Sequence, residues 1–150
     1  MSQRSLLTGC VWIVETLWNM YQREIIQYIN NQFSFMDELV ESEDIFSCYD
    51  CENKQYIIEI KSRDKHYDPW MIEKKKFVSN LKKANELDKE FLYLTEYRTK
   101  IIIWNITNLV RVNYDFKWEK RKMPRTTEFV DTKQILKEVG YLYEKYAKQY

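Results

Sequence analysis

The segment at residues 55–61 places the strongest constraint on how this chain can fold. Its run Tyr56-Ile57-Ile58-Glu59-Ile60-Lys61 is rich in β-branched residues, which predicts a largely buried strand. Side chains of a strand alternate between its two faces, so Glu59 and Lys61 share one face with Ile57. Burying charged groups is costly unless they are paired or bound to a metal. The fold must therefore supply these two groups with partners, either as a cross-strand ion pair or as a metal site.

Length and composition predict one domain spanning residues 1–150. The 150 residues are 45% hydrophobic, which allows a sizeable core and argues against disorder. The 2 glycines, Gly9 and Gly140, are too few for a glycine-rich phosphate loop, and this excludes P-loop and Rossmann proteins. No apolar run approaches the roughly 18 residues that span a membrane, so no membrane association is expected.

The cysteines indicate a reducing compartment. Cys10, Cys48 and Cys51 are an odd number and too few for a disulfide framework. Residues 6–10 resemble a lipoprotein attachment box, but only two apolar residues precede Cys10, where an export signal needs roughly 7 to 15. We therefore expect a cytoplasmic protein. The low glycine content and the many Lys, Asn, Ile and Tyr residues suggest an AT-rich genome, for which a phage and its host cytoplasm would fit.

Hydrophobic periodicity predicts an α/β (α+β) domain around a small mixed sheet. Residues 33–40 are ambiguous, and residues 110–118 could form a strand or an extended arm. Pro69 is expected to open the second helix, and Asp131 with Gln134 resembles the start of the last one. The expected order is a helix at 11–30, strands at 45–49 and 55–61, a helix at 70–87, strands at 91–95 and 100–105, and a helix from 131.

Charge is balanced overall but divided into blocks. The chain has 24 Lys plus Arg and 23 Asp plus Glu, for a net charge of +1. Residues 37–59 contain eight acids and one base, residues 61–83 eight bases and three acids, and residues 111–125 six bases and two acids. This order fits an acidic metal-binding centre flanked by surfaces that attract phosphate, although each block alone could be a solvated surface.

A hairpin register identifies the acid that faces Glu59. A two-residue turn at Glu52-Asn53 would pair Cys51 with Lys54 and place Asp44 opposite Lys61. Asp44 would then lie diagonal to Glu59 at roughly 7 Å, a distance that one metal ion can bridge. Asp50 would lie four residues from Glu59, about 13 Å away. A three-residue turn would bring in Glu43 instead.

An aspartate, a hairpin and Glu-x-Lys, flanked by helices, resemble the PD-(D/E)XK nuclease superfamily. The pattern here is Asp44 followed by Glu59-Ile60-Lys61, and the resemblance covers about residues 11–106. It implies a restriction-endonuclease-like core of helix, three strands, helix and strand. Residues 107–150 would add a C-terminal arm and helix. The chain departs from the family pattern in lacking a proline before Asp44 and in its long spacing of fifteen residues from Asp44 to Glu59.

The resemblance also implies the roles of the site residues. Asp44, Glu59 and the main-chain carbonyl of Ile60 would bind Mg²⁺ or Mn²⁺, and Lys61 would position the attacking water. Glu24, on the inward side of the first helix, could join the metal site. Oxygen ligands of this kind suit Mg²⁺, which neutralises charge on a phosphodiester and activates water.

The basic segments are the predicted nucleic-acid contacts. Lysines on the second helix point away from its apolar face, and Tyr114, Phe116 and Trp118 alternate before a basic run, as in surfaces that bind backbone and stacked bases. The same arm could instead pack on a partner subunit. The predicted DNA-binding residues are Arg63, Lys65, Lys75, Lys82, Lys83, Lys120, Arg121, Lys122 and Arg125.

Competing interpretations have less support in the sequence. Cys48 and Cys51 have CxxC spacing, but only Cys10 and His66 could complete a zinc site, and no strand-helix context favours redox chemistry. The sequence therefore predicts a Mg²⁺-dependent endodeoxyribonuclease that acts as a homodimer or higher oligomer, since cutting both strands usually needs two sites. The alternative is an inactive nuclease-like module that binds nucleic acid or a protein.

Overall fold

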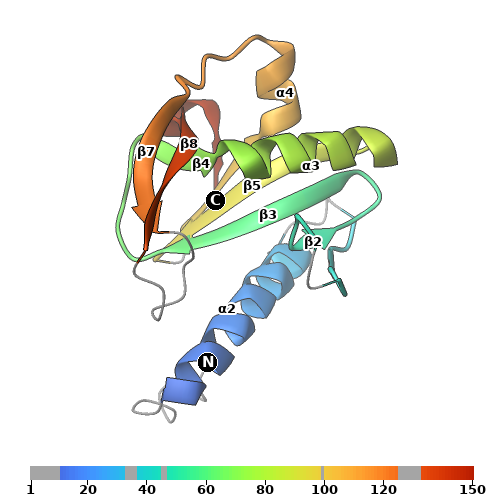
Figure 1. Cartoon of the computed structure of the whole chain (residues 1–150). Helices are drawn as coiled ribbons and strands as arrows, with labels where there is room; N and C mark the ends of the chain where they lie inside the picture. The colour runs from blue at the N-terminus through green and yellow to red at the C-terminus, as the bar shows by residue number, and fades with distance from the viewer. Residues whose placement is uncertain (1–10, 33–36, 45–46, 99, 125–132) are drawn as a thin grey trace.

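The computed structural model describes residues 11–32, 37–44, 47–98, 100–124 and 133–150. These residues form a mixed α/β structure with two sheets (Figure 1). The helices are α2 (Val11–Gln32), α3 (Lys74–Leu87) and α4 (Ile106–Arg111), with a short 3-10 turn at Glu144–Tyr146. The strands are β1 (Val40–Glu41), β2 (Cys51–Glu52), β3 (Tyr56–Arg63), β4 (Trp70–Glu73), β5 (Glu90–Tyr97), β6 (Lys100–Asn105), β7 (Glu119–Pro124), β8 (Gln134–Leu142) and β9 (Lys148–Gln149).

The larger sheet is mixed and has the strand order β1-β2-β3-β5-β6-β9. Strands β3 and β5 are parallel along their whole length, with Glu59 beside Tyr93 and Lys61 beside Thr95, while the other neighbours are antiparallel. Parallel neighbours need a crossover, which α3 provides. The expected small mixed sheet is thus confirmed, and so are the strands predicted at residues 55–61, 91–95 and 100–105.

Helices cover both faces of this sheet, which explains why its central strands are apolar on both sides. The buried residues Ile25, Ile26 and Ile29 of α2 belong to one apolar cluster with Ile58 and Ile60 of β3. Ala84 of α3 belongs to a second cluster, on the opposite face, with Ile57 and Trp104. Figure 1 shows α2 and α3 on opposite sides of β3. Glu59 and Lys61 share the face of Ile57, and therefore face the side of α3.

The second sheet corrects two sequence-based expectations. Residues 70–73 form strand β4 and not the first turn of a helix, so α3 begins at Lys74. The predicted C-terminal helix is strand β8, which lies between β4 and β7. Val139 and Leu142, expected on one helical face, are three residues apart and therefore point to opposite faces of the strand, where both are fully buried. Asp131, its expected start, lies outside the described residues.

Close packing explains the glycine in β8. A Cβ atom at Gly140 would lie 2.7 Å from the ring of Trp118, so only glycine lets this ring lie against the strand. Trp118 in turn stacks on Phe116 and meets Phe77 of α3 edge-on. The segment predicted as a strand or arm, residues 110–118, is the end of α4 followed by this aromatic stretch, whose rings pack in the second apolar cluster. Residues beyond 106 also return to the main sheet, where β9 pairs with β6.

Candidate active site

The β2–β3 hairpin turns later than its sequence suggests. Asn53, only 7% exposed, accepts hydrogen bonds through its side-chain oxygen from the backbone N–H groups of Gln55 and Tyr56, both at 2.8 Å. Its own N–H donates to the carbonyl of Tyr56 at 3.0 Å. Asparagine stabilises such turns by replacing backbone partners with its side chain. The turn therefore lies at residues 54–55, between Asn53 and Tyr56, and not at residues 52–53.

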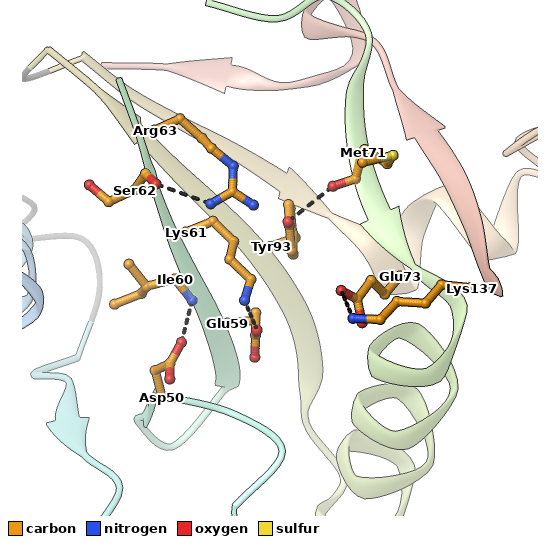
Figure 2. A network of polar contacts seen from close by, with 10 residues as sticks. All are labelled: Asp50, Glu59, Ile60, Lys61, Ser62, Arg63, Met71, Glu73, Tyr93 and Lys137. Carbon is orange, nitrogen blue, oxygen red and sulfur yellow. Dashed lines mark hydrogen bonds and ion pairs between the residues drawn. The ribbon is translucent and has the colours of Figure 1, made fainter. Parts of the chain in front are cut away.

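This later turn moves the strand register, and the predicted register is wrong. Cys51 pairs with Ile58 and not with Lys54, while Glu52 pairs with Ile57. The regular pairing ends at Cys51, because the N–H of Asp50 also donates to the carbonyl of Ile58, at 2.9 Å, and Asp50 is thus shifted by one residue from that register. Asp50 nevertheless lies near Glu59, whose negative charge acts on it, and Figure 2 shows the two side chains close together beside β3. The acid that the predicted register left at the far end of the hairpin is the one beside Glu59.

A backbone hydrogen bond fixes the carboxylate of Asp50. Its Oδ2 accepts the N–H of Ile60 at 2.6 Å, as Figure 2 shows. A short bond from an N–H to an ionised oxygen is a strong one. The chain between Asp50 and Ser42 is itself tied down, since the N–H of Ser42 donates to the carbonyl of Asp50.

Glu59 and Lys61 form an ion pair along β3. Nζ of Lys61 lies 3.1 Å from Oε1 of Glu59, and the side chain of Glu59 is only 3% exposed while that of Lys61 is 33% exposed. In Figure 2 both project from the same strand, beside Asp50 and on the side of Tyr93. The charged pair expected at residues 59 and 61 is therefore present, with its carboxylate buried and its ammonium reaching solvent.

The electrostatics of the site are dominated by two neighbouring carboxylates. Burial, followed by the negative charge of Glu59, raises the pKa of Asp50 to about 6. The N–H of Ile60 and the positive charges of Lys61 and Lys76 act in the opposite direction. Near neutral pH the ionised pair therefore repels itself in a partly dry site, and a bound cation would relieve that repulsion.

The donor set fits a hard divalent cation. Asp50 and Glu59 supply carboxylate oxygens close to each other beside β3. Within the described residues no cluster of three or more His, Cys, Asp or Glu side chains is arranged for metal binding. Two carboxylates are nevertheless enough for Mg²⁺, which usually keeps several of its waters and relies on one or two carboxylates.

Tyr93 forms the wall of the site on β5. It lies beside Glu59 in the parallel ladder and donates its hydroxyl hydrogen bond to the carbonyl of Met71 at 3.2 Å. Burial raises the pKa of Tyr93, so the phenol stays neutral. Beyond it, Glu73 and Lys137 form an ion pair at 3.2 Å that joins the end of β4 to β8 (Figure 2).

The remaining predicted metal ligands lie elsewhere. Asp44 is exposed and outside the β2–β3 ladder, and Glu43 is also exposed. Glu24 belongs to α2, which packs on the sheet face opposite to Glu59. Ile60 is adjacent to the site, although the contact observed there is made by its N–H.

The predicted DNA-contacting residues are spread over three surfaces. Arg63 and Lys65 are exposed at and after the end of β3, and Lys75 and Lys82 are exposed on α3. Lys83 is partly exposed, with Glu86 at 3.9 Å. Strand β7 carries a further exposed set, Lys120, Arg121 and Lys122, while Arg125 lies outside the described residues.

The described cysteines and the histidine do not form a common metal site. Cys51 is fully buried in the apolar cluster under α2, Cys48 is half-buried, and burial raises the pKa of both thiols. Nε2 of His66 lies 2.5 Å from Oε1 of Glu144, which also accepts from the indole of Trp70. The zinc interpretation therefore finds no support among the described residues, and Cys10 lies outside them.

The sequence interpretation missed two contributors, Asp50 and Lys76. Asn53, followed by two polar residues, was the available signal for a later turn and hence for Asp50. Lys76 acts electrostatically on Asp50 from α3 and was not distinguished from the neighbouring lysines. It lies four residues before the buried Asn80, which is a signal that it points toward the sheet.

Comparison with known proteins assigns no family. The chain matches no protein-family model and no curated protein. None of the helices in the part of the chain that the structure describes is long and apolar enough to cross a membrane.

Proposed function

We propose that this protein is a Mg²⁺-dependent endodeoxyribonuclease of the PD-(D/E)XK type, with Asp50 in place of Asp44 as the first acid of the motif. The observation that carries the proposal is the position of Asp50 beside Glu59, fixed by its bond from the N–H of Ile60, while Glu59 is paired with Lys61 on the same strand. The order of α2, β1, β2, β3, β4, α3 and β5, in which β4 belongs to the second sheet, supports a restriction-endonuclease-like core. The parallel pairing of β3 with β5 supports it too.

Each residue has a separate task in this proposal. Asp50 and Glu59 would hold Mg²⁺ or Mn²⁺, which supplies charge neutralisation on the phosphodiester and lowers the pKa of a bound water. Lys61 would orient the water that adds to phosphorus, as the P–O bond to the leaving sugar oxygen breaks. A compact ammonium suits this task because it hydrogen-bonds through several donors and does not replace a metal ligand.

Affinity for DNA would come from other elements. The exposed cations of α3 and β7 would contact phosphates, which carry no sequence information but fix the position of the duplex. Cleavage of both strands would require two sites, and we propose a homodimer or higher homo-oligomer for this reason.

Plasmid cleavage tests the proposal directly. The purified protein should convert supercoiled plasmid to open-circular or linear DNA with Mg²⁺ or Mn²⁺, and should lose this activity in EDTA. Asp50→Asn should remove the activity while leaving DNA binding intact. If the parent protein binds DNA but cuts no single-stranded, double-stranded or branched substrate with either metal, a non-catalytic binding module replaces the nuclease.

A further inference from the structure

The lysines of α3 are not equivalent, although they are adjacent in the sequence. The buried residues of the helix are Asn80 and Ala84. Lys76 lies one turn before Asn80 and shares its face, because residues four apart in a helix are stacked. It is accordingly half-buried, whereas Lys75, rotated by about 100°, is exposed. Lys74 lies on a different side of α3, with its Nζ 4.2 Å from the centre of the Trp118 ring.

The connection after α3 indicates which part of β3 lies level with Lys76. The N–H of Lys89 donates to the carbonyl of Ala84 at 2.8 Å, and the N–H of Glu90 donates to that of Gln55 at 2.9 Å. Ala84, near the end of α3, therefore lies close to the first residues of β3 and β5. Lys76 precedes Ala84 by eight residues, which is about 12 Å along the helix axis. Along a strand, about 12 Å corresponds to about 3.6 residues. Counted from the start of β3, this places Lys76 level with Glu59.

The charge of Lys76 is directed at the site. Lys76 is among the groups whose positive charge acts on Asp50 and on Cys48, both of which precede β2. Within the described chain, no carboxylate lies within ion-pairing distance of its Nζ. Lys61, Lys83, Lys89 and Lys137, in contrast, each have such a partner.

We propose that Lys76 is a second cation of the site and binds an oxygen of the scissile phosphate from the side of α3, opposite to Lys61 on β3. The inference rests on the proposed nuclease function and extends it to a substrate-positioning residue. A half-buried ammonium that acts on the carboxylate of Asp50 but forms no ion pair with it is matched by a phosphodiester brought into the site. The phosphate would then contact one lysine from the strand and one from the helix.

Matched substitutions on one helical turn test this role. Lys76→Gln should lower kcat for plasmid cleavage by about 10- to 100-fold, since it removes one donor to the developing charge. Lys76→Arg should recover part of the loss. Lys74→Gln removes the same charge two residues away and should change kcat by less than about twofold. Equal losses in Lys76→Gln and Lys74→Gln would overturn the proposal.

The affinity for Mg²⁺ distinguishes an electrostatic role of Lys76 from a purely structural one. In titration calorimetry without DNA, Lys76→Gln should bind Mg²⁺ about two- to fivefold more tightly, because a positive charge near Asp50 is gone. Lys74→Gln should leave the affinity unchanged. Circular dichroism and melting temperature check that both variants fold. Unchanged or weakened Mg²⁺ binding in Lys76→Gln would contradict the placement of Lys76 near the acids.

Failure of the nuclease proposal is distinguishable from failure of this one. If the parent protein does not cut DNA, binding of a short duplex in Ca²⁺ still decides the role of Lys76. Lys76→Gln should then weaken binding at least about fivefold more than Lys74→Gln does. Equal weakening would remove Lys76 from the site irrespective of catalysis.

Discussion

The carboxylate of Asp50 accepts the backbone N–H of Ile60 at 2.6 Å, and this bond holds the acid against β3 beside Glu59. The contact uses an N–H of the strand that carries the Glu-x-Lys pair, so the second acid is tied to the same element as the first. The geometry of the candidate site consequently depends on one strand and the turn that precedes it.

The first prediction concerns Asp50 and pH. Its pKa of about 6 in the folded protein lies above its ordinary value of 3.8, so the folded state binds a proton more tightly than the unfolded state. The contribution of protonated Asp50 to folding stability is fully present below pH 3.8 and is lost as the pH rises through about 6. Asp50→Asn, whose amide oxygen can still accept the N–H of Ile60, should be more stable than the parent at pH 7.5 without metal.

The stabilisation expected for Asp50→Asn is about 1 to 2 kcal/mol after allowance for solvent screening. Urea unfolding at several pH values in EDTA measures it, and the difference should vanish near pH 3.5. Adding Mg²⁺ should stabilise the parent but not the variant. A variant less stable than the parent at pH 7.5 would show that Asp50 is not under electrostatic strain.

The second prediction separates the acids of the site from the acid outside it. Glu59→Gln and Lys61→Ala should each reduce plasmid cleavage by about 100-fold or more while retaining DNA affinity in metal-free buffer. Asp44→Asn is the control, because Asp44 is exposed and lies outside the β2–β3 ladder. Loss of activity in Asp44→Asn together with full activity in Asp50→Asn would reverse our assignment.

The third prediction concerns the turn that sets the register. Asn53→Ala removes two accepted hydrogen bonds and the bond donated by its Nδ2 to the carbonyl of Asp37 at 3.0 Å. Losing these bonds in a buried turn should cost about 2 to 3 kcal/mol in chemical denaturation. Lys54→Ala, in the same turn but exposed, should cost less than about 0.5 kcal/mol. Similar effects of the two substitutions would argue against Asn53 as the determinant of the hairpin.

The fourth prediction tests the packing of the second sheet. Gly140→Ala places a methyl group 2.7 Å from the ring of Trp118, too close for the ring to stay in place, and 3.0 Å from Cβ of Phe116, a tight contact. The displaced aromatic stretch should cost about 1 to 3 kcal/mol of stability and lower the melting temperature. Trp118→Leu in the same chain should recover part of that loss. A melting temperature unchanged by Gly140→Ala would mean that Trp118 does not lie against β8.

The fifth prediction concerns DNA affinity. Replacing Lys75, Lys82 and Lys83 by alanine should weaken binding and flatten its salt dependence, with the slope falling by about 0.9 for each phosphate that the protein no longer neutralises. Fluorescence anisotropy at several salt concentrations gives the slope. Replacing Lys120, Arg121 and Lys122 of β7 in the same way compares the two surfaces. An unchanged slope in the α3 variant would show that this helix face does not bind DNA.

The sequence alone determined the elements that depend on short-range pattern. The wide apolar stripe of residues 11–30 predicted α2, and the β-branched runs predicted β3, β5 and β6. The alternation of side chains along β3 also placed Glu59 and Lys61 on one face, as the structure has them. These features depend only on neighbouring residues and are therefore readable without knowledge of the partners.

Only the tertiary structure decided which residues meet across those elements. Ile135, Val139 and Leu142 have a spacing compatible with a helix, yet they form β8 because β4 and β7 supply hydrogen-bonding partners on both sides. Asn53 fixes a later turn by bonding the backbone that follows it and so sets the pairing of β2 with β3, and the N–H of Ile60 then holds Asp50 beside Glu59. Local periodicity specifies which face a side chain occupies, whereas register depends on hydrogen bonds formed at a turn and between distant strands.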